Sequence, residues 1–492
     1  YHLFFWKCLK LQFLECHGLC SHCIFVAQFT TTKPMRPFEI LTLILIAGTL
    51  AVLFTQRDRK IFLYLTCAAI LSMFLQFGIE GHRWQFAPAV YLLPAIYIFH
   101  RFQKSEINTV TKGFLSIWFS VAVILPWIIP VFALPNPGGA HGIGTETFHW
   151  VDSSRMEWFT DENPNDVREI IVQVWYPAVK NANVKPEPYL DFINLRAKTL
   201  AGAGGIPEFF PSHLNHIYTN SFKEIPIIES DQLMPVVIFS HGITGTRHLH
   251  QIMYEYLASR RYIVVAPDHS FDANLTIFPD GHMADYRSNI TGHPDSANVR
   301  KMQMNARAAD ISFIIGQLEK MHSGKIISKI KGKIDFNKIA VGGHSYGGST
   351  ATVSAQRDMR ISVCFVLDSW ISPVPDETIK AGVRVPFLFM GRPTWEGSDY
   401  PKNYPRLDSL MAHSTDPKYR IVIKETQHLD FTDIPLFSPL IHYVMDVGTL
   451  SVSESMPLIN NLVHSFLNTF LMGDDIILFN NLLTHEFILQ IK

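Results

Sequence analysis

Long apolar runs crowd the first third of the chain, whereas shorter apolar runs alternate with mixed stretches in the rest. The long runs cover 38–54, 61–79, 86–99 and 113–134 and contain almost no charge. A helix needs roughly 17–25 mostly apolar residues to cross a bilayer; the third run is shorter and contains prolines. We interpret the four runs as transmembrane helices that anchor the protein, rather than as a buried helical bundle of a soluble domain.

Lysine and arginine residues between these runs predict an orientation. The loops after the first and third runs are basic, whereas the loop after the second run carries only Arg83. Basic loops favour the cytoplasmic side of a membrane. The Pro- and Gly-rich stretch 134–144 reads as a flexible exit into a second part of the chain. We therefore expect a multi-pass membrane protein with its second part on the extracytoplasmic side.

From about residue 145 the pattern is that of a parallel sheet. Short runs rich in β-branched residues alternate with amphipathic stretches that predict helices at 246–261 and 297–322. The predicted strands cover 168–177, 234–240, 262–267, 338–343, 361–367, 385–391 and 419–424. Strands that are apolar throughout and separated by helices indicate an α/β sheet covered on both faces. Ligands bind such sheets beyond the carboxyl ends of the strands.

These patterns divide the chain into four parts. Residues 1–34 precede the first methionine and are expected to be a non-native or disordered extension. Residues 35–136 form the membrane anchor, residues 137–475 the catalytic domain, and residues 476–492 a C-terminal tail.

Composition excludes some functions. The 42 Lys+Arg residues balance the 43 Asp+Glu residues, so no nucleic-acid partner is indicated. Four of the six cysteines lie in 1–34, where ECHGLCSHC has a spacing that would suit zinc. The other two cysteines cannot form a disulfide framework. We assign no metal site and expect no cofactor.

The stretch IAVGGHSYGG (339–348) carries the strongest chemical signal. It places Ser345 in a G-x-S-x-G pattern, directly after a predicted strand and before a run of small residues that predicts a helix. A serine on such a tight strand-to-helix turn projects its hydroxyl from the sheet edge, and glycines let the neighbouring backbone pass closely. Ser345 is therefore the candidate nucleophile.

A serine nucleophile needs a base, and the base needs an acid. His428 follows the last predicted strand, and Asp368 follows the strand after the serine. The order Ser, Asp, His is that of α/β-hydrolases. Glu396 and Asp399 are alternative acids, because they follow the next strand.

The reaction also needs donors for a developing oxyanion. The stretch VVIFSHGITG (236–245) places a turn after a predicted strand. The backbone N–H groups of Ile243 and of Tyr346, the residue after the serine, are the candidate donors.

Four blocks in order, FSHGITG, GHSYGGS, VLDSW and QHLDF, resemble the plasma-type platelet-activating factor acetylhydrolases over roughly residues 145–470. The resemblance implies an α/β-hydrolase fold with Ser345, Asp368 and His428 as the triad, and favours Asp368 over Glu396. It also implies calcium-independent hydrolysis of sn-2 esters that carry acetyl, short or oxidised acyl chains. The runs within 38–134 have no counterpart in the secreted members of the family.

The first hypothesis is a membrane-anchored serine esterase that acts on a lipid or another small ester. A serine peptidase or an acyltransferase on the same triad remains an alternative, as does a membrane-bound protein that binds its ligand without catalysis. The aromatic and Gly-rich segment 200–218 forms either a lid that faces lipid or a surface loop. The oligomeric state is left open.

Overall fold

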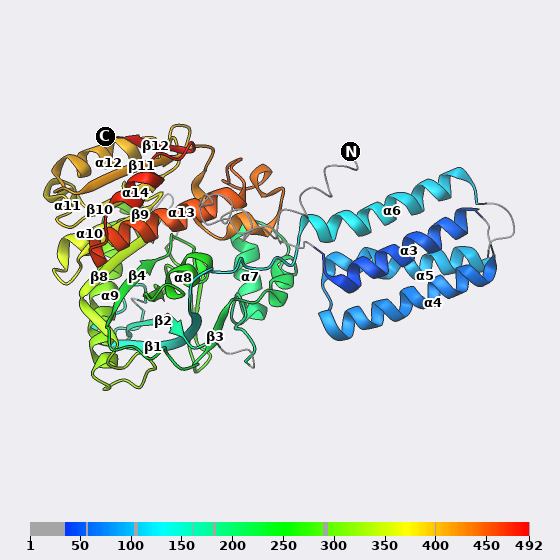
Figure 1. Ribbon diagram of the computed structural model, residues 1–492, viewed down its shortest axis with the longest axis horizontal. Coiled ribbons are helices and arrows are strands. Elements are labelled where there is room, and N and C mark those ends of the chain that lie inside the picture. Colours follow the sequence, from blue (N-terminus) through cyan, green and yellow to red (C-terminus); the bar gives the residue numbers. More distant parts are fainter. Residues whose placement is uncertain are drawn as a thin grey trace, which may run out of the picture.

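The computed structural model describes residues 35–55, 58–102, 107–160, 162–180, 184–288, 294–398 and 400–491. The cysteine-rich motif in 1–34 and the alternative acid Asp399 lie outside these residues. A helical bundle stands beside a larger α/β part (Figure 1).

The bundle contains four helices. They are α3 (Pro37–Thr55), α4 (Arg59–Leu75), α5 (Ala87–Phe102) and α6 (Thr109–Ile128). Helix α4 continues as a π-helix over Gln76–Glu80. In the described part of the chain, three helices are long and apolar enough to cross a membrane: α3, α4 with its extension, and α6. Helix α5 has only 16 residues and contains Pro94, so the expectation of four spanning helices is corrected to three candidates.

A buried ion pair ties one end of the bundle together. The guanidinium of Arg83 donates two hydrogen bonds of 2.7 Å to the carboxylate of Glu39, and both side chains are fully buried. Arg83 also donates to the carbonyl oxygen of Ile129 at 2.9 Å. One side chain therefore joins the start of α3, the α4–α5 connection and the end of α6.

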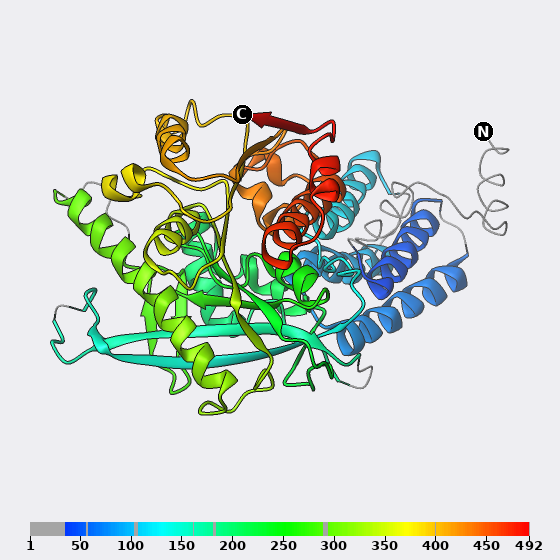
Figure 2. The same cartoon turned by 60° about the vertical axis from the view of Figure 1, so that its left-hand side comes forward.

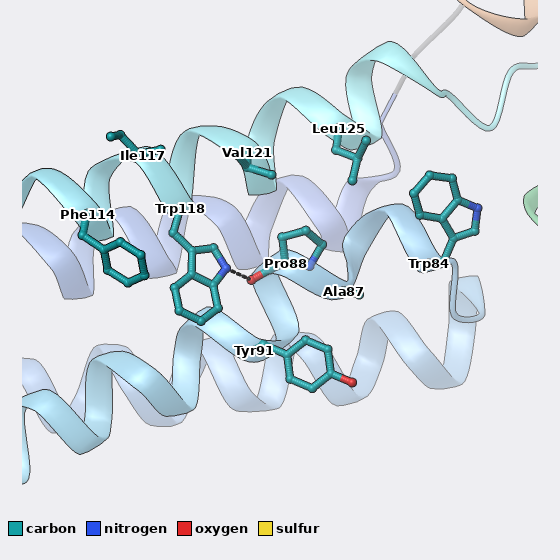
Figure 3. Close-up of a pocket in the computed structure, with 9 residues that line it drawn as sticks. All are labelled: Trp84, Ala87, Pro88, Tyr91, Phe114, Ile117, Trp118, Val121 and Leu125. Atoms are coloured by element: carbon teal, nitrogen blue, oxygen red, sulfur yellow. Dashed lines mark hydrogen bonds between the residues drawn. The ribbon is translucent and has the colours of Figure 1, made fainter. Parts of the chain in front are cut away.

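A groove of about 490 Å³ runs between α5 and α6 (Figure 3). Its lining is apolar and aromatic: Trp84, Ala87, Pro88, Tyr91, Phe114, Ile117, Trp118, Val121 and Leu125. The indole N–H of Trp118 donates to the carbonyl oxygen of Pro88 at 3.0 Å. All of these residues belong to the bundle, so the groove lies outside the candidate catalytic site.

The α/β part is built on a ten-stranded sheet with the order β12-β11-β10-β9-β8-β4-β5-β2-β1-β3. The six strands from β11 to β5 run parallel, whereas β12 and β2 pair antiparallel at either side of them. The strands are β1 (Gly142–Met156), β2 (Val167–Ala178), β3 (Ser221–Lys223), β4 (Met234–Ser240), β5 (Ile263–Asp268), β8 (Ile334–His344), β9 (Val363–Leu367), β10 (Phe387–Gly391), β11 (Lys418–Ile423) and β12 (Ile488–Ile491). A separate hairpin joins β6 (Leu275–Ile277) to β7 (Met283–Asp285).

Helices cover both faces of this sheet. One core cluster packs α9 (Ser296–His322), α10 (Tyr346–Arg357), α11 (Asp376–Ala381) and α12 (Asn403–His413) on the strands. The other packs α8 (Gln251–Ala258), α13 (Val452–Leu467) and α14 (Ile477–Leu482) on the opposite face. Figure 2 shows the long α9 crossing in front of the extended β1–β2 ribbon. Because side chains of the parallel strands are buried on both faces, these strands are apolar throughout.

Residues 476–491, the described part of the expected C-terminal tail, contribute helix α14 and the edge strand β12 to the α/β part. Strand β12 pairs antiparallel with β11, and Phe479 of α14 is fully buried in the core.

The segment 200–218 joins the two parts of the protein. It contains the end of α7 (Ile193–Gly204) and a 3₁₀ turn at Phe210–His216. The indole N–H of Trp84 donates to the carbonyl oxygen of Phe210 at 3.1 Å, and the His216 ring bonds the carbonyl oxygen of His82 at 2.7 Å. The segment thus packs against the bundle instead of forming a free surface loop.

Candidate active site

Ser345 lies on the turn between β8 and α10. Its φ of 55° and ψ of −122° belong to a backbone region that residues with side chains rarely adopt. The Ser345 N–H donates to the carbonyl oxygen of Leu367 at 3.0 Å, and its carbonyl oxygen accepts from the N–H of Trp370 at 3.0 Å. Leu367 and Trp370 lie on either side of Asp368 in the sequence, so these two bonds hold Ser345 beside Asp368.

The glycines around Ser345 allow backbone segments to pack at very short range. A Cβ atom at Gly343 would lie 2.1 Å from the carbonyl oxygen of Gly347. A Cβ atom at Gly347 would lie 2.0 Å from the carbonyl oxygen of Ser240 at the end of β4, and one at Gly348 would lie 2.6 Å from the Ser369 side chain. The turn can therefore pack against β4 and β9 only because these three glycines carry no side chain.

The candidate acid and base are in direct contact. Asp368 follows β9 and is fully buried, and His428 follows β11. The Nδ1 atom of His428 lies 2.6 Å from Oδ2 of Asp368. An ionised carboxylate only accepts hydrogen bonds, so Nδ1 carries the proton and Nε2 of the neutral ring is left as the base.

Further contacts hold this pair in place. Oδ1 of Asp368 accepts from the backbone N–H of Arg392 at 3.1 Å and from the indole N–H of Trp395 at 3.3 Å. Burial raises the pKa of Asp368, but the hydrogen bond from His428 and the charges of His428 and Arg392 outweigh burial and leave this pKa below its usual value. His344, the residue before Ser345, donates from Nε2 to the carbonyl oxygen of His428 at 2.9 Å. The carboxylate is thus kept ionised beside the imidazole.

The loop after β4 passes directly over Ser345. A Cβ atom at Gly242 would lie 3.1 Å from Cβ of Ser345, and Ile243 is the next residue. Among the described residues, no acceptor takes up the backbone N–H of Ile243 or of Tyr346. The Ser345 hydroxyl likewise forms no hydrogen bond there. All three groups therefore keep their hydrogen-bonding capacity for a substrate.

Buried side chains fix the shape of this loop. The ring of His241 bonds the carbonyl oxygen of Gly242 at 2.6 Å through Nδ1 and accepts from the backbone N–H of His269 at 3.1 Å through Nε2. Burial holds the pKa of His241 well below its usual value, so the ring is neutral at physiological pH. Arg307 donates to the carbonyl oxygen of His241. These bonds position the loop that carries Ile243.

The alternative acid Glu396 does not take part in this site. Glu396 is exposed, and its backbone N–H donates to the Thr394 hydroxyl at 2.9 Å. Within the described ranges, no group of three or more His, Cys, Asp or Glu side chains could hold a metal ion.

Sequence reasoning missed three residues that surround the acid and base. His344 stands at a variable position of the serine motif, so the motif carries no expectation about its side chain. Arg392 and Trp395 follow β10, the strand beside β9. Their place after a predicted strand that neighbours Asp368 is the signal that could have found them.

The sheet order and the serine turn define the class of this protein. A mostly parallel sheet with Ser345 on a strained turn, followed along the chain by Asp368 and then His428, is the arrangement of an α/β-hydrolase. A ferulic acid esterase from Streptomyces cinnamoneus has a similar fold, with a TM-score of 0.59 and 23% sequence identity. The match covers 73% of this chain and 99% of the esterase.

The chain belongs to the family described as platelet-activating factor acetylhydrolase, isoform II, whose model matches residues 158–483. It is 25% identical to the platelet-activating factor acetylhydrolase of Gallus gallus over 261 residues, which are 47% of this chain and 61% of the chicken protein. It is 22% identical to a probable 1-alkyl-2-acetylglycerophosphocholine esterase of Arthroderma benhamiae, over 70% of this chain and 89% of the fungal protein. The match to the chicken protein thus spans about three-fifths of that relative's length.

Proposed function

We propose that this chain is a membrane-anchored serine hydrolase that removes short or oxidised acyl chains from the sn-2 position of phospholipids similar to platelet-activating factor. The observation that carries the proposal is the 2.6 Å contact between His428 and the buried Asp368, beside Ser345 on its strained turn. The names of the family and of its relatives support the substrate class.

In the first half of the proposed reaction, Ser345 Oγ attacks the ester carbonyl carbon while Nε2 of His428 takes the hydroxyl proton. Asp368 stabilises the imidazolium that results. The N–H groups of Ile243 and Tyr346 donate to the oxyanion. When the tetrahedral intermediate collapses, the ester C–O bond breaks, and the departing lysophospholipid alkoxide takes the proton from His428.

In the second half, water reacts with the acyl-serine. His428 takes one proton from the water, the resulting hydroxide attacks the acyl carbon, and the Ser345 oxygen leaves and recovers its proton. The products are a carboxylic acid and the free enzyme. Apart from the ester and one water molecule, these steps use only groups of this chain.

The helical bundle would anchor the hydrolase in the membrane, next to a phospholipid substrate. Three helices have the length and composition to cross a membrane, and segment 200–218 connects them to the α/β part through Trp84 and His216. We infer that the helices anchor the protein in several passes, with the α/β part on the extracytoplasmic side.

A hydrolysis profile tests the proposed function. The full chain in detergent is given phosphatidylcholines with two-, six- and sixteen-carbon sn-2 chains, next to a nitrophenyl acetate reference. Hydrolysis is expected to be fastest for the two-carbon chain, and Ser345→Ala is expected to lower kcat by about 10⁶. Equal turnover by wild type and Ser345→Ala would refute the mechanism, and a preference for the sixteen-carbon chain would refute the substrate class.

A further inference from the structure

A buried arginine and the candidate base both contact the candidate acid. Arg392 follows β10, and its side chain is 8% exposed. Its Nε lies 3.3 Å from Oδ2 of Asp368, the same oxygen that lies 2.6 Å from Nδ1 of His428. Because both contacts meet at one oxygen, the guanidinium Nε and the imidazole Nδ1 lie within about 6 Å of each other.

Two further residues hold the guanidinium at this place. Arg392 donates from Nη1 to Oδ2 of Asp446 at 2.8 Å. The backbone carbonyl oxygen of Asp446 accepts from the N–H of Leu429, the residue after His428, at 2.8 Å. The guanidinium carbon lies 4.1 Å from the centre of the Trp395 ring, which packs edge-on against the His428 ring at 5.5 Å. Arg392 is therefore fixed to both segments that carry the acid and the base.

We propose that Arg392 is a positioning residue that sets the pH range in which His428 can act as the base. The inference rests on the proposed function. A positive charge within 4–6 Å disfavours formation of a second one, so the guanidinium opposes protonation of the imidazole, whereas Asp368 favours it. With Arg392 in place, the reaction of Ser345 that depends on this base is therefore expected to extend to a lower pH.

Other titratable groups near His428 come from several elements. Asp368 follows β9, and His344 ends β8, where burial keeps its pKa well below the usual value and the ring neutral. Asp446 lies in the loop before α13 and is half-exposed. Burial raises the pKa of Asp430, two residues after His428, to about 6. Because Asp430 is present in every variant proposed below, its titration contributes equally to each profile.

The test is the rate at which a fluorophosphonate labels the full chain in detergent, measured from pH 4.5 to 9 in roughly half-unit steps. This readout needs no knowledge of the natural substrate, because the probe reports the reactivity of the serine. Arg392→Met is expected to move the acid-side midpoint upward by about one pH unit, and Arg392→Lys to restore it. Asp446→Asn is expected to move the midpoint downward, because a negative charge that partly offsets the guanidinium is lost.

Arg420→Met is the matched control. Arg420 also lies over an aromatic ring, at 4.3 Å from the centre of Tyr404, and also pairs with an aspartate, Asp408. Its partner is not the candidate acid, so this variant is expected to keep the wild-type midpoint. The control thus separates the loss of a stacked ion pair from the loss of a charge beside the triad.

The outcomes distinguish this inference from the proposed function. An unchanged midpoint in Arg392→Met, or an unchanged midpoint in Asp446→Asn, would overturn the role of Arg392 while the serine chemistry stands. An equal upward shift in Arg392→Lys would also overturn it, because the charge would then be irrelevant. A wild-type protein that reacts with the probe at no pH would instead refute the proposed serine mechanism itself.

Discussion

A single methyl group at Gly347 should disable the site without touching any reacting atom. In Gly347→Ala the new Cβ atom would lie 2.0 Å from the carbonyl oxygen of Ser240 and 2.6 Å from that of His241. Cβ atoms essentially never approach other heavy atoms closer than 3.0 Å. Both obstacles are backbone atoms, so the start of α10 and the end of β4 must separate by about 1 Å.

This separation acts on both candidate oxyanion donors. Tyr346 belongs to the segment that moves on one side, and Ile243 to the loop on the other. A misplacement of about 1 Å can cost roughly 10² in rate, and loss of one donor costs about 10²–10³. We therefore expect kcat/KM to fall by at least about 10² in Gly347→Ala.

Nitrophenyl acetate hydrolysis by the full chain measures this effect, with thermal unfolding recorded alongside. Gly316→Ala is the matched control, because Gly316 lies within α9 and a Cβ atom there would meet nothing within 4 Å. The control should keep wild-type activity and gain up to about 1 kcal/mol of stability. If Gly347→Ala retained activity within about threefold of wild type, the close packing argued for this turn would be wrong.

Two other substitutions test the acid and Asp433, a buried carboxyl that follows His428 in the sequence. Asp368→Asn is expected to lower kcat by about 10⁴ with little change in thermal unfolding, because the amide favours the wrong imidazole tautomer; a loss below tenfold would contradict its role as the acid. Burial raises the pKa of Asp433 to about 7, although the backbone N–H groups of Gln251 and Ile252 donate to it. A raised pKa stabilises the folded protein at low pH, and this contribution is lost as pH rises toward 7. The Tm of Asp433→Asn should therefore exceed the wild-type Tm by more at pH 8 than at pH 5. At pH 8 the expected difference in the free energy of unfolding is at most about 4 kcal/mol. Equal Tm differences at the two pH values would show that this carboxyl does not titrate as stated.

The parallel strands and the residues at their ends were predictable from local sequence, and the reason is physical. Strands buried on both faces are apolar throughout, so 234–240 was predicted with the bounds of β4. Ser345 follows β8 and Asp368 follows β9 directly, as expected for groups at the carboxyl edge of the sheet. The contact between Asp368 and His428 depends on strand order, which the sequence pattern does not specify.

Strands β1 and β12 were not predicted. Strand β1 carries the buried polar residues Thr145 and Glu146, which bond Gln173 and Ser328 respectively. Partners so distant in sequence cannot be seen in a local hydropathy pattern. Strand β12 joins the sheet through pairing with β11, and no local signal specifies that partner. Arg392 does follow a predicted strand, but that position alone does not specify its contacts with Asp368 and Asp446.

The most direct test of the account is to identify the residue that a fluorophosphonate modifies. The full chain is labelled in detergent, digested, and its peptides are assigned by mass spectrometry, with heat-unfolded protein as the control. A single adduct on the Ser345 hydroxyl, absent after unfolding, is the expected result. An adduct on another serine of the folded protein, or no adduct on a chain that still hydrolyses esters, would contradict the claim that Ser345 is the nucleophile.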